Sequence, residues 1–193
     1  MSTFAIHDYE HAWPDAFRDA ARRLRTALGE RADRIDHVGS TSVPGLASKD
    51  VIDIQVSVAP GTDLGSVARV LERAGWTLLP GIDRDHVVPG SPPDERAWRK
   101  VFLNEPPGYR SVNVHVRVVG QPNQRYPLLF RDYLRAHPPS AQAYATLKRD
   151  LAGLLADDLD RYADVKDAAC DLIYFAAEAW AQATGWSPRQ SDA

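Results

Sequence analysis

The stretch HVGSTSVPGLASKDVIDIQVSV, residues 37–58, carries the most structural information in the sequence. Its first part, 39–50, holds two Gly, one Pro and four hydroxyl side chains, a composition typical of a loop. Its second part, 51–58, alternates apolar and polar residues, as expected for a β-strand with two different faces. The apolar residues are Ile52, Ile54, Val56 and Val58, and the polar ones are Asp53, Gln55 and Ser57.

Both kinds of secondary structure are expected on either side of this stretch. Apolar residues at three- and four-residue spacing predict helices, and short alternating or β-branched runs predict strands. Strands are expected over 34–38, 76–79, 98–103 and 111–119. Helices are expected over 14–28, from a cap at Asp63 to Ala74, over 126–136, over 140–155 with Ser140 as cap, and over 160–184. The sequence therefore predicts an α/β (α+β) fold whose last third is helical.

Length and composition are those of an ordinary globular domain. The chain has 193 residues, 23 Lys and Arg, 26 Asp and Glu, and a net charge of −3. At roughly 150 residues per domain, we expect a single domain over 1–193. A sheet-containing part is expected over 1–120, a helical part over 121–186, and a frayed tail over 187–193. The near-neutral charge makes a long nucleic acid an unlikely partner, and a single cysteine excludes a disulfide framework.

The chain is expected to be cytoplasmic and not embedded in a membrane. No apolar run approaches the roughly 20 residues of a membrane-spanning helix. The N-terminal residues MSTFAIHDYEHAW lack the basic start and apolar core of a signal peptide.

Polar side chains follow two alternating strands. The strand 51–58 carries Asp53 and Gln55, and the strand 111–119 carries Asn113, His115 and Arg117 on the face opposite its valines. One interpretation is a solvated sheet face, which is common in antiparallel sheets. The other is the floor of a metal–phosphate site, because Asp is depleted in strands and a carboxylate beside a Gly/Ser loop suits a hard cation and phosphate.

Five segments together resemble the GrpB-like family of the nucleotidyltransferase superfamily. They are 37–58, NVHVRV (113–118), LFRDYLRAHP (129–138), YATLKRDLA (144–152) and YADVK (162–166). The resemblance is strongest to the GrpB-like domain appended to some bacterial dephospho-CoA kinases. The G-x-x-x-x-G-K-[ST] motif of such a kinase is absent, so the chain is not expected to be that kinase itself.

This resemblance implies a nucleotidyltransferase-like small mixed β-sheet with flanking helices and a C-terminal helical part. It also implies a site for a nucleotide or similar phosphorylated ligand, with Mg²⁺ or another divalent metal. Asp53 and His115 are the predicted catalytic residues, and Asp53, Gln55 and His115 the predicted metal ligands. The predicted phosphate-binding residues are Gly39, Ser40, Thr41, Ser42, Lys49, Arg131, Lys148 and Lys166.

The predicted site departs from the superfamily pattern at two positions. Gln55 stands where a second carboxylate is expected, and the later strand offers Asn113 and His115 instead of a third. Mg²⁺ prefers anionic oxygen ligands, so one carboxylate supports two-metal chemistry poorly. Three interpretations remain: a one-metal transferase, a site for a metal that accepts histidine, or a binding module without turnover. The module would hold a nucleotide-like ligand or a partner such as dephospho-CoA kinase.

Other residues have a structural interpretation beside the functional one. Lys49 and the helical cations also suit a solvated surface, and the serines of the loop also suit turns. His37 is interpreted as a hydrogen-bonded core residue, although a metal cluster of His37, Asp53 and His115 is an alternative. Cys170 is interpreted as a buried, inert thiol. Asp85 and His86 lie in a Pro-rich stretch and are interpreted as part of a surface turn.

Overall fold

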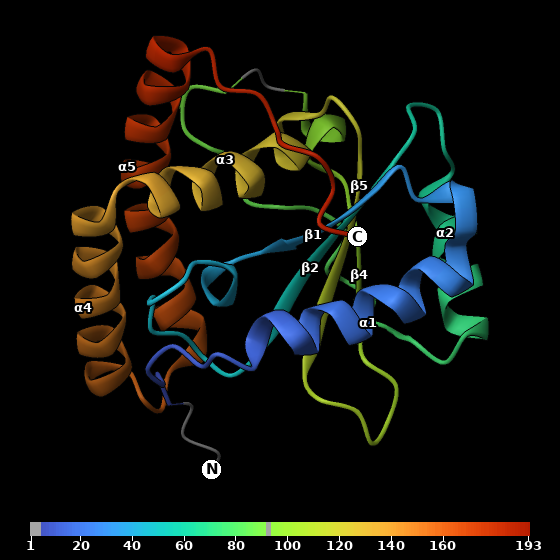
Figure 1. The fold of residues 1–193 in the computed structure, drawn as a ribbon, viewed down its shortest axis with the longest axis horizontal. Helices are drawn as coiled ribbons and strands as arrows, with labels where there is room; N and C mark the ends of the chain where they lie inside the picture. The colour runs from blue at the N-terminus through green and yellow to red at the C-terminus, as the bar shows by residue number, and fades with distance from the viewer. Residues whose placement is uncertain (1–4, 92–93) are drawn as a thin grey trace.

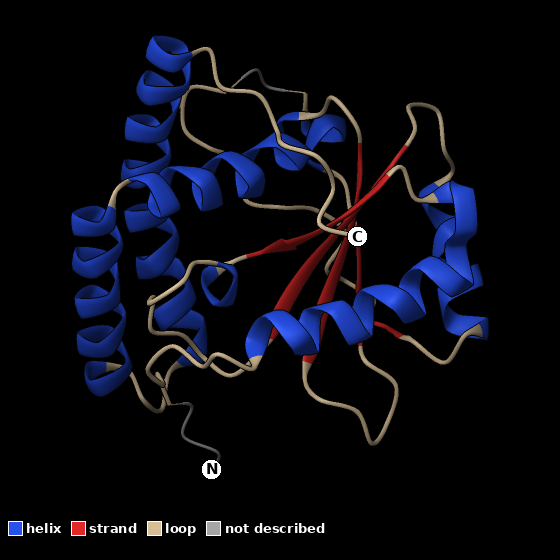
Figure 2. Cartoon of the chain, in the orientation of Figure 1, coloured by secondary structure: helices blue, strands red, loops and turns tan. Residues whose placement is uncertain are grey.

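The computed structural model describes residues 5–91 and 94–193, and inside α5 it leaves the side chains of 159 and 160 undescribed. A five-stranded mixed sheet lies between two groups of helices (Figures 1 and 2). The strands are β1 Arg34–Val38, β2 Ile52–Val58, β3 Thr77–Leu78, β4 Val101–Asn104 and β5 Val112–Val118. The helices are α1 Trp13–Leu28, α2 Leu64–Arg73, α3 Pro122–Ala136, α4 Pro138–Leu154 and α5 Leu159–Thr184. Short 3₁₀ turns cover Gly29–Arg31, Ser40–Ser42 and Glu95–Trp98.

The sheet has the order β1-β2-β5-β4-β3, and only β2 and β5 pair in parallel. The parallel register places Asp53 beside Asn113 and Gln55 beside His115. The two alternating strands of the sequence are therefore direct neighbours. Their polar residues face the same side of the sheet, because paired residues in adjacent strands point the same way.

The helices α1 and α2 cover the apolar face of the sheet. The alternating apolar residues of β2 and β5 form one core with Trp13, Phe17 and Leu24 of α1 and with Leu71 of α2. The named side chains of α1 and α2 are at most 4% exposed, so the predicted apolar face of α1 and the predicted apolar face of the strands pack together in this core. Asp63 caps α2 by accepting hydrogen bonds from the backbone N–H groups of Gly65 and Ser66, as predicted.

The second face of the sheet is covered by α3. Gln55 Nε2 donates to the carbonyl of Gln124 at 2.9 Å, and Gln124 Nε2 donates to Ser57 Oγ at 3.2 Å. Gln55 and Ser57 are fully buried as a result. The interpretation of a solvated sheet face is therefore wrong for these positions, because a helix with a polar face lies on them.

The helices α4 and α5 pack against α3 on the side away from the sheet (Figure 1). A second core joins Phe130, Tyr144 and Cys170 of these helices to Val43 and Leu46 of the loop 39–50. The loop that precedes β2 is thus anchored by apolar contacts to the helical part. This contact brings the loop, the start of β2 and three helices around one space.

Several element boundaries differ from those expected. The helix α3 begins at Pro122 instead of at 126, and α4 begins at Pro138 with His137 at its cap instead of Ser140. Both helices have Pro in the first turn, where its missing N–H costs no hydrogen bond. Trp98 lies in a 3₁₀ turn and β4 begins at Val101, so the strand expected over 98–103 is shorter than predicted.

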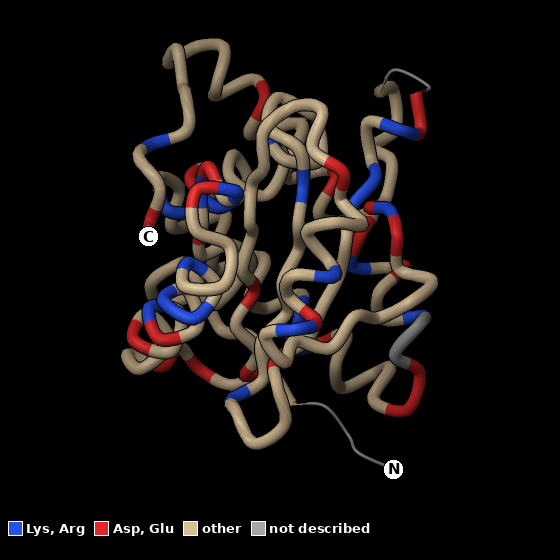
Figure 3. Tube along the Cα trace, turned by 90° about the vertical axis from the view of Figure 1, so that its right-hand side faces the viewer, with Lys and Arg blue, Asp and Glu red and all other residues tan. Residues whose placement is uncertain are grey.

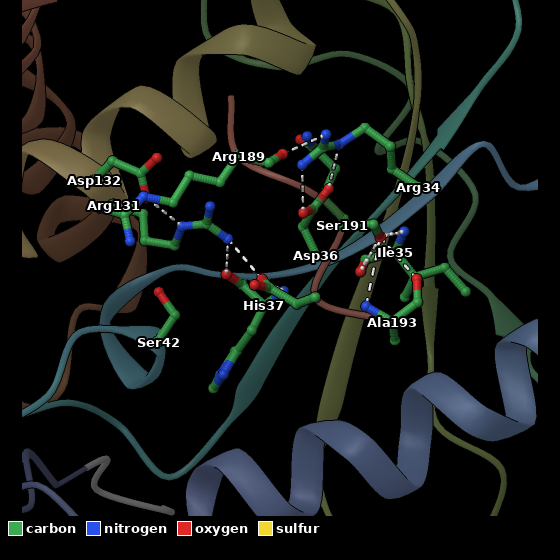
Figure 4. A network of polar contacts seen from close by, with 12 residues as sticks. Arg34, Ile35, Asp36, His37, Ser42, Arg131, Asp132, Arg189, Ser191 and Ala193 are labelled. Carbon is green, nitrogen blue, oxygen red and sulfur yellow. Dashed lines mark hydrogen bonds and ion pairs between the residues drawn. The ribbon is translucent and has the colours of Figure 1, made fainter. Parts of the chain in front are cut away.

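The tail expected to fray is ordered against the outer edge of β1. Ser191 Oγ accepts a hydrogen bond from the backbone N–H of Ile35 and donates to its carbonyl, both at 2.9 Å (Figure 4). The backbone N–H of Ala193 also donates to the Ile35 carbonyl at 3.1 Å. The tail therefore satisfies backbone groups that an edge strand otherwise leaves unpaired.

Charged residues are interspersed along the chain. Segments of Lys and Arg alternate with segments of Asp and Glu over the trace (Figure 3). Among the described residues, no helix is both long enough and apolar enough to cross a membrane. A local cluster of cations is therefore needed to attract an anionic ligand to a defined place.

Candidate functional site

A cavity of about 580 Å³ lies between the polar face of the sheet and the helical part. The loop 39–50, β2, β5, α3, α4 and α5 all contribute to its wall. The predicted site residues that line it are Gly39, Ser40, Lys49, Asp53, His115, Lys148 and Lys166. Segments far apart in the sequence therefore meet in one space, whose volume is typical of small-molecule sites.

Asp53 stands on the floor of the cavity and is held by side chains of β5. Asn113 Nδ2 donates to Asp53 Oδ1 at 2.9 Å, and His115 Nε2 lies 3.9 Å from the same oxygen. Burial tends to raise the pKa of Asp53, but the neighbouring His115, the hydrogen bond from Asn113 and the charge of Lys166 outweigh it and lower the pKa. The carboxylate is therefore ionised at neutral pH.

Gly39 allows the loop to pass directly over Asp53. Its φ is +69°, and a Cβ at this position would lie 2.4 Å from Asp53 Oδ2. Any side chain would both clash with the carboxylate and strain the backbone, since L residues rarely adopt this φ. The glycine is followed by the short 3₁₀ turn Ser40–Ser42, so the Gly-Ser pair is where the family resemblance places the phosphate.

Lys148 reaches the cavity from α4 and contacts the loop. Its Nζ donates to Ser40 Oγ at 2.8 Å and to the carbonyl of Ala47, and it lies 4.5 Å from the ring centroid of Tyr144. The residue is 2% exposed, and burial lowers its pKa to about 7. Nearby Lys166 and Arg149 lower the pKa further, whereas Cys170 opposes the shift. An anion beside Lys148 would favour its charged form.

Two more lysines approach the same space from other elements. Lys49 lies in the loop with its Nζ 4.4 Å from the ring centroid of Tyr162, and Lys166 Nζ lies 3.1 Å from Asp167 Oδ1 on α5. Burial and the charge of Lys166 lower the pKa of Lys49. We call Lys49, Lys148 and Lys166 the lysine cluster. The charge of Lys166 lowers the pKa of both Lys49 and Lys148, so a bound anion would relieve this repulsion. Burial acts to lower the pKa of Lys166 itself, but Cys170 and Asp167 outweigh it and raise the pKa.

Four predicted site residues do not line the cavity. Thr41 is fully buried with its Oγ1 3.0 Å from His37 Nε2, and Ser42 Oγ donates to the carbonyl of Gly39. Gln55 Oε1 accepts from Arg117 at 2.8 Å while its amide nitrogen binds α3. These polar groups are used inside the protein, and the structure does not bring them into the cavity with the other predicted site residues.

Arg131 is the fourth residue, and it lies in a separate network at β1 (Figure 4). The residue is 1% exposed. Its guanidinium donates to the carbonyl of His37 at 2.9 Å, to Asp132 Oδ1 at 2.9 Å and to Asp192 Oδ2 at 2.7 Å. Two carboxylates and a carbonyl already surround this cation, and the structure does not bring it together with the other predicted phosphate-binding residues.

Three charged residues of the floor form a network that the sequence interpretation missed. Asp85 accepts two hydrogen bonds from Arg117 and one from Lys100, each at 2.8 Å. Burial acts to raise the pKa of Asp85, but the two cations hold it well below its usual range. The interpretation of Asp85 as part of a surface turn is wrong. The available signal was Arg117, because an arginine on a covered strand face needs a carboxylate partner.

Two other residues have clear structural roles. His37 stacks on Phe17 with ring centroids 4.9 Å apart, and burial lowers its pKa to about 3, as expected of a core histidine. Cys170 is buried as predicted, with its Sγ 3.2 Å from the hydroxyl of Tyr144, and it lines the cavity. His86 also lines the cavity, and its Nε2 lies 2.8 Å from Asp171 Oδ2.

The protein donors around Asp53 do not fit a metal site made of protein ligands. Among the residues that the structure describes, no group of three His, Cys, Asp or Glu side chains could hold a metal ion. The alternative cluster of His37, Asp53 and His115 is not formed, since His37 Nε2 is engaged with Thr41. Asp53 offers one carboxylate at this position, so a bound Mg²⁺ would depend on waters and ligand phosphates for most of its oxygen ligands.

Comparisons with known proteins agree with this architecture. The family model described as GrpB protein matches residues 3–175. The crystal structure of the conserved protein GrpB from Enterococcus faecalis is similar with a TM-score of 0.72 and 30% identity, over 91% of this chain and 99% of that one. A chain of the GLD-2/RNP-8 complex is 10% identical to this chain, with a TM-score of 0.51. The match covers 81% of this chain and 49% of that one, and it shows similarity of fold alone.

Two kinds of curated relative are similar in sequence. A dephospho-CoA kinase of Mycolicibacterium paratuberculosis is 38% identical over 91% of this chain, which spans 46% of that protein. A UPF0157 protein of Halalkalibacterium halodurans is 33% identical over 92% of this chain and 84% of its own length. The chain thus spans about half of the kinase relatives and most of the shorter one. The match of a family model over most of the sequence shows that this chain belongs to the GrpB family.

Proposed function

We propose that the cavity binds a small phosphorylated ligand of nucleotide type. The observation that carries this proposal is the lysine cluster, which brings cations from the loop, α4 and α5 to one cavity beside Gly39 and Ser40. Phosphate oxygens accept hydrogen bonds from such ammonium groups and from hydroxyls, and charge-assisted bonds of this kind are the strong ones.

The size and the aromatic lining support a ligand with a ring. The cavity of about 580 Å³ suits a mononucleotide and leaves no room for a folded nucleic acid. Tyr126, Tyr144 and Tyr162 line the same space as the lysines. Aromatic side chains offer stacking surfaces to bases, so phosphates on the lysine cluster and a ring against a tyrosine make one consistent pose.

Binding without turnover is favoured over nucleotidyl transfer. Transfer would require Asp53 to hold a metal ion beside the triphosphate, but Asn113 and His115 already occupy the neighbourhood of its Oδ1. Labelled triphosphates incubated with cell metabolites in Mg²⁺ or Mn²⁺ test the point. An Asp53-dependent nucleotidyl product or pyrophosphate would establish the enzyme and contradict the binding module.

A partner-binding role is the second candidate, and the relatives supply its motivation. Proteins named dephospho-CoA kinase contain a similar segment that this chain matches over about half of their length. A chain of this family could therefore associate with a separate kinase of that type. Pull-down of the kinase with the purified chain tests the partner-binding role. If no kinase is retained at micromolar concentrations, the partner-binding role is rejected.

Thermal and chemical unfolding test the ligand proposal directly. A ligand at 100 times its Kd adds about 2.7 kcal/mol to the free energy of unfolding. We expect at least one of ATP, CTP, GTP, UTP or a CoA-type compound to stabilise the wild type and to stabilise Lys148→Met less. If none of these compounds changes the unfolding midpoint at millimolar concentration, the small-ligand proposal fails.

A further inference from the structure

Asp53 is surrounded by hydrogen-bond donors in positions where a metal site needs lone pairs. Asn113 presents its amide N–H to Asp53 Oδ1 at 2.9 Å, so the amide oxygen is turned away from that position. The register of β2 and β5 fixes this pair, since Asp53 and Asn113 are direct partners in the parallel ladder. Asn113 therefore acts as a donor to the carboxylate.

His115 is also a donor toward Asp53. Its Nδ1 lies 3.2 Å from Arg117 Nη2, and a guanidinium can only donate, so Nδ1 is the accepting nitrogen of the ring. A neutral ring that accepts at Nδ1 carries its one proton on Nε2. This Nε2–H faces Asp53 Oδ1 at 3.9 Å and has no lone pair for a metal.

Two other nearby side chains are already engaged, and Asp53 Oδ2 lies under the Gly39 backbone, where no side chain fits. Gln55 Oε1 accepts from Arg117, and Asp85 is paired with Arg117 and Lys100. The side-chain oxygens that could complete the coordination shell of a metal ion therefore already accept hydrogen bonds from other side chains of the protein.

Cations of the protein line the same cavity as Asp53. The Nζ of Lys148 lies 2.8 Å from Ser40 Oγ, next to Gly39, whose backbone passes over Asp53. Lys49 and Lys166 also line this cavity. The lysine cluster can therefore supply, in the same space, the positive charge that a metal ion would bring.

We propose that the phosphate groups bind here without a divalent metal, with the lysine cluster supplying the positive charge and Asp53 acting as a repulsive, loop-positioning carboxylate. This inference rests on the proposed function. It predicts that Asp53→Asn keeps or strengthens binding, because Asn can still accept from Asn113 but carries no charge. A metal-dependent site would lose its ligand with the same substitution.

Isothermal titration calorimetry with pyrophosphate and with ATP tests the inference on the full chain. The wild type is titrated at matched ionic strength in EDTA and in excess MgCl₂, followed by Asp53→Asn and the control Asp150→Asn, an exposed acid on α4. We expect a Kd in EDTA equal to or lower than that in MgCl₂. Asp53→Asn is expected to lower the Kd about 2- to 10-fold, by removing a like charge at short range, and Asp150→Asn to leave it within 2-fold.

Three outcomes are distinguishable. Binding in EDTA with retention in Asp53→Asn supports the inference. Binding that requires MgCl₂, or that disappears in Asp53→Asn, overturns the inference and leaves the proposed function intact. No binding under either condition overturns both. The comparison of EDTA with MgCl₂ uses the wild type alone, so a folding defect in the variant does not weaken the test.

Discussion

Arg131 and Lys148 lie on neighbouring helices and are almost completely buried, but their surroundings differ in kind. Arg131 donates to two carboxylates and a backbone carbonyl, in the network that joins α3 to β1 and the tail. Lys148 contacts a hydroxyl, a carbonyl and an aromatic ring, and it lines a cavity. The sequence predicts phosphate binding for both residues. In the structure they differ in the acceptors that already surround them.

The difference shows what distinguishes a structural cation from one available to a ligand. A buried guanidinium surrounded by acids has its charge compensated inside the fold, and a phosphate would have no geometric access to it. A buried ammonium without a paired carboxylate loses charge, and Lys148 shows this as a pKa of about 7. A buried cation that has no carboxylate partner therefore indicates a ligand-binding position more clearly than the residue type alone does.

The largest expected effect comes from breaking the structural network. Arg131→Met leaves Asp132 buried without its main partner and leaves the His37 carbonyl without a donor. Removing one partner of a buried ion pair costs about 3–5 kcal/mol, so we expect a loss of this size in urea unfolding.

Arg149→Met is the matched control for this loss. Arg149 pairs with Asp8 on the surface, with side chains 47% and 91% exposed, and its loss is expected to cost less than about 0.5 kcal/mol. Equal destabilisation by the two substitutions would contradict the structural role of Arg131.

Each of the two regions contains a buried histidine that makes the stability of the fold depend on pH. His37 lies in the β1 network with its pKa lowered to about 3, and His115 lies in the cavity with its pKa lowered to about 4. Unfolded histidine titrates near 6.5, so the unfolded state binds more protons between about pH 4 and 6.5. Stability therefore falls as pH decreases through this window, by up to about 1.4 kcal/mol per pH unit for each histidine.

Urea unfolding between pH 7 and 4.5 measures this slope. His37→Phe removes one titrating group and keeps the ring stacked on Phe17, so the slope should fall to about half of that of the wild type. An unchanged slope would show that His37 is protonated in the folded state.

A smaller effect is expected at the tail. Asp192 accepts from the His37 backbone N–H at 3.0 Å and from Arg131 at 2.7 Å, and its side chain is 30% exposed. Asp192→Ala should reduce the free energy of unfolding by about 1–2 kcal/mol, less than Arg131→Met, because Asp132 still pairs with the arginine. Hydrogen exchange should increase at the amides of Ile35 and His37. Unchanged protection there would argue that the tail does not cover β1 in solution.

Periodicity predicted the elements that local sequence determines. The alternation in β2 and β5, the spacing in α1 and the cap at Asp63 are properties of short windows, and each appears where expected. The burial of Gln55 was not predictable from its strand, because it depends on α3, which lies about 70 residues later in the chain. Alternation identifies the two faces of a strand and does not say what covers each of them.

The candidate site was predicted in part for the same reason. Gly39, Ser40 and Asp53 lie within one short segment and line the cavity together, as the motif predicts. Asp85 was missed because its partner Arg117 is 32 residues away, and the tail was missed because its partners lie on β1. Long-range pairing between charged side chains carries no local pattern, so only the assembled fold shows which cations remain for a ligand.

The measurement that tests the account most directly is stabilisation by pyrophosphate. Urea unfolding of the wild type and of Lys148→Met is compared with and without pyrophosphate, with NaCl at the same ionic strength as control. We predict that Lys148→Met lowers the free energy of unfolding without ligand by about 1–3 kcal/mol, because the buried carbonyl of Ala47 loses its donor, and that pyrophosphate stabilises the variant far less than the wild type. Full stabilisation of Lys148→Met by pyrophosphate would contradict the assignment of the lysine cluster as the phosphate site.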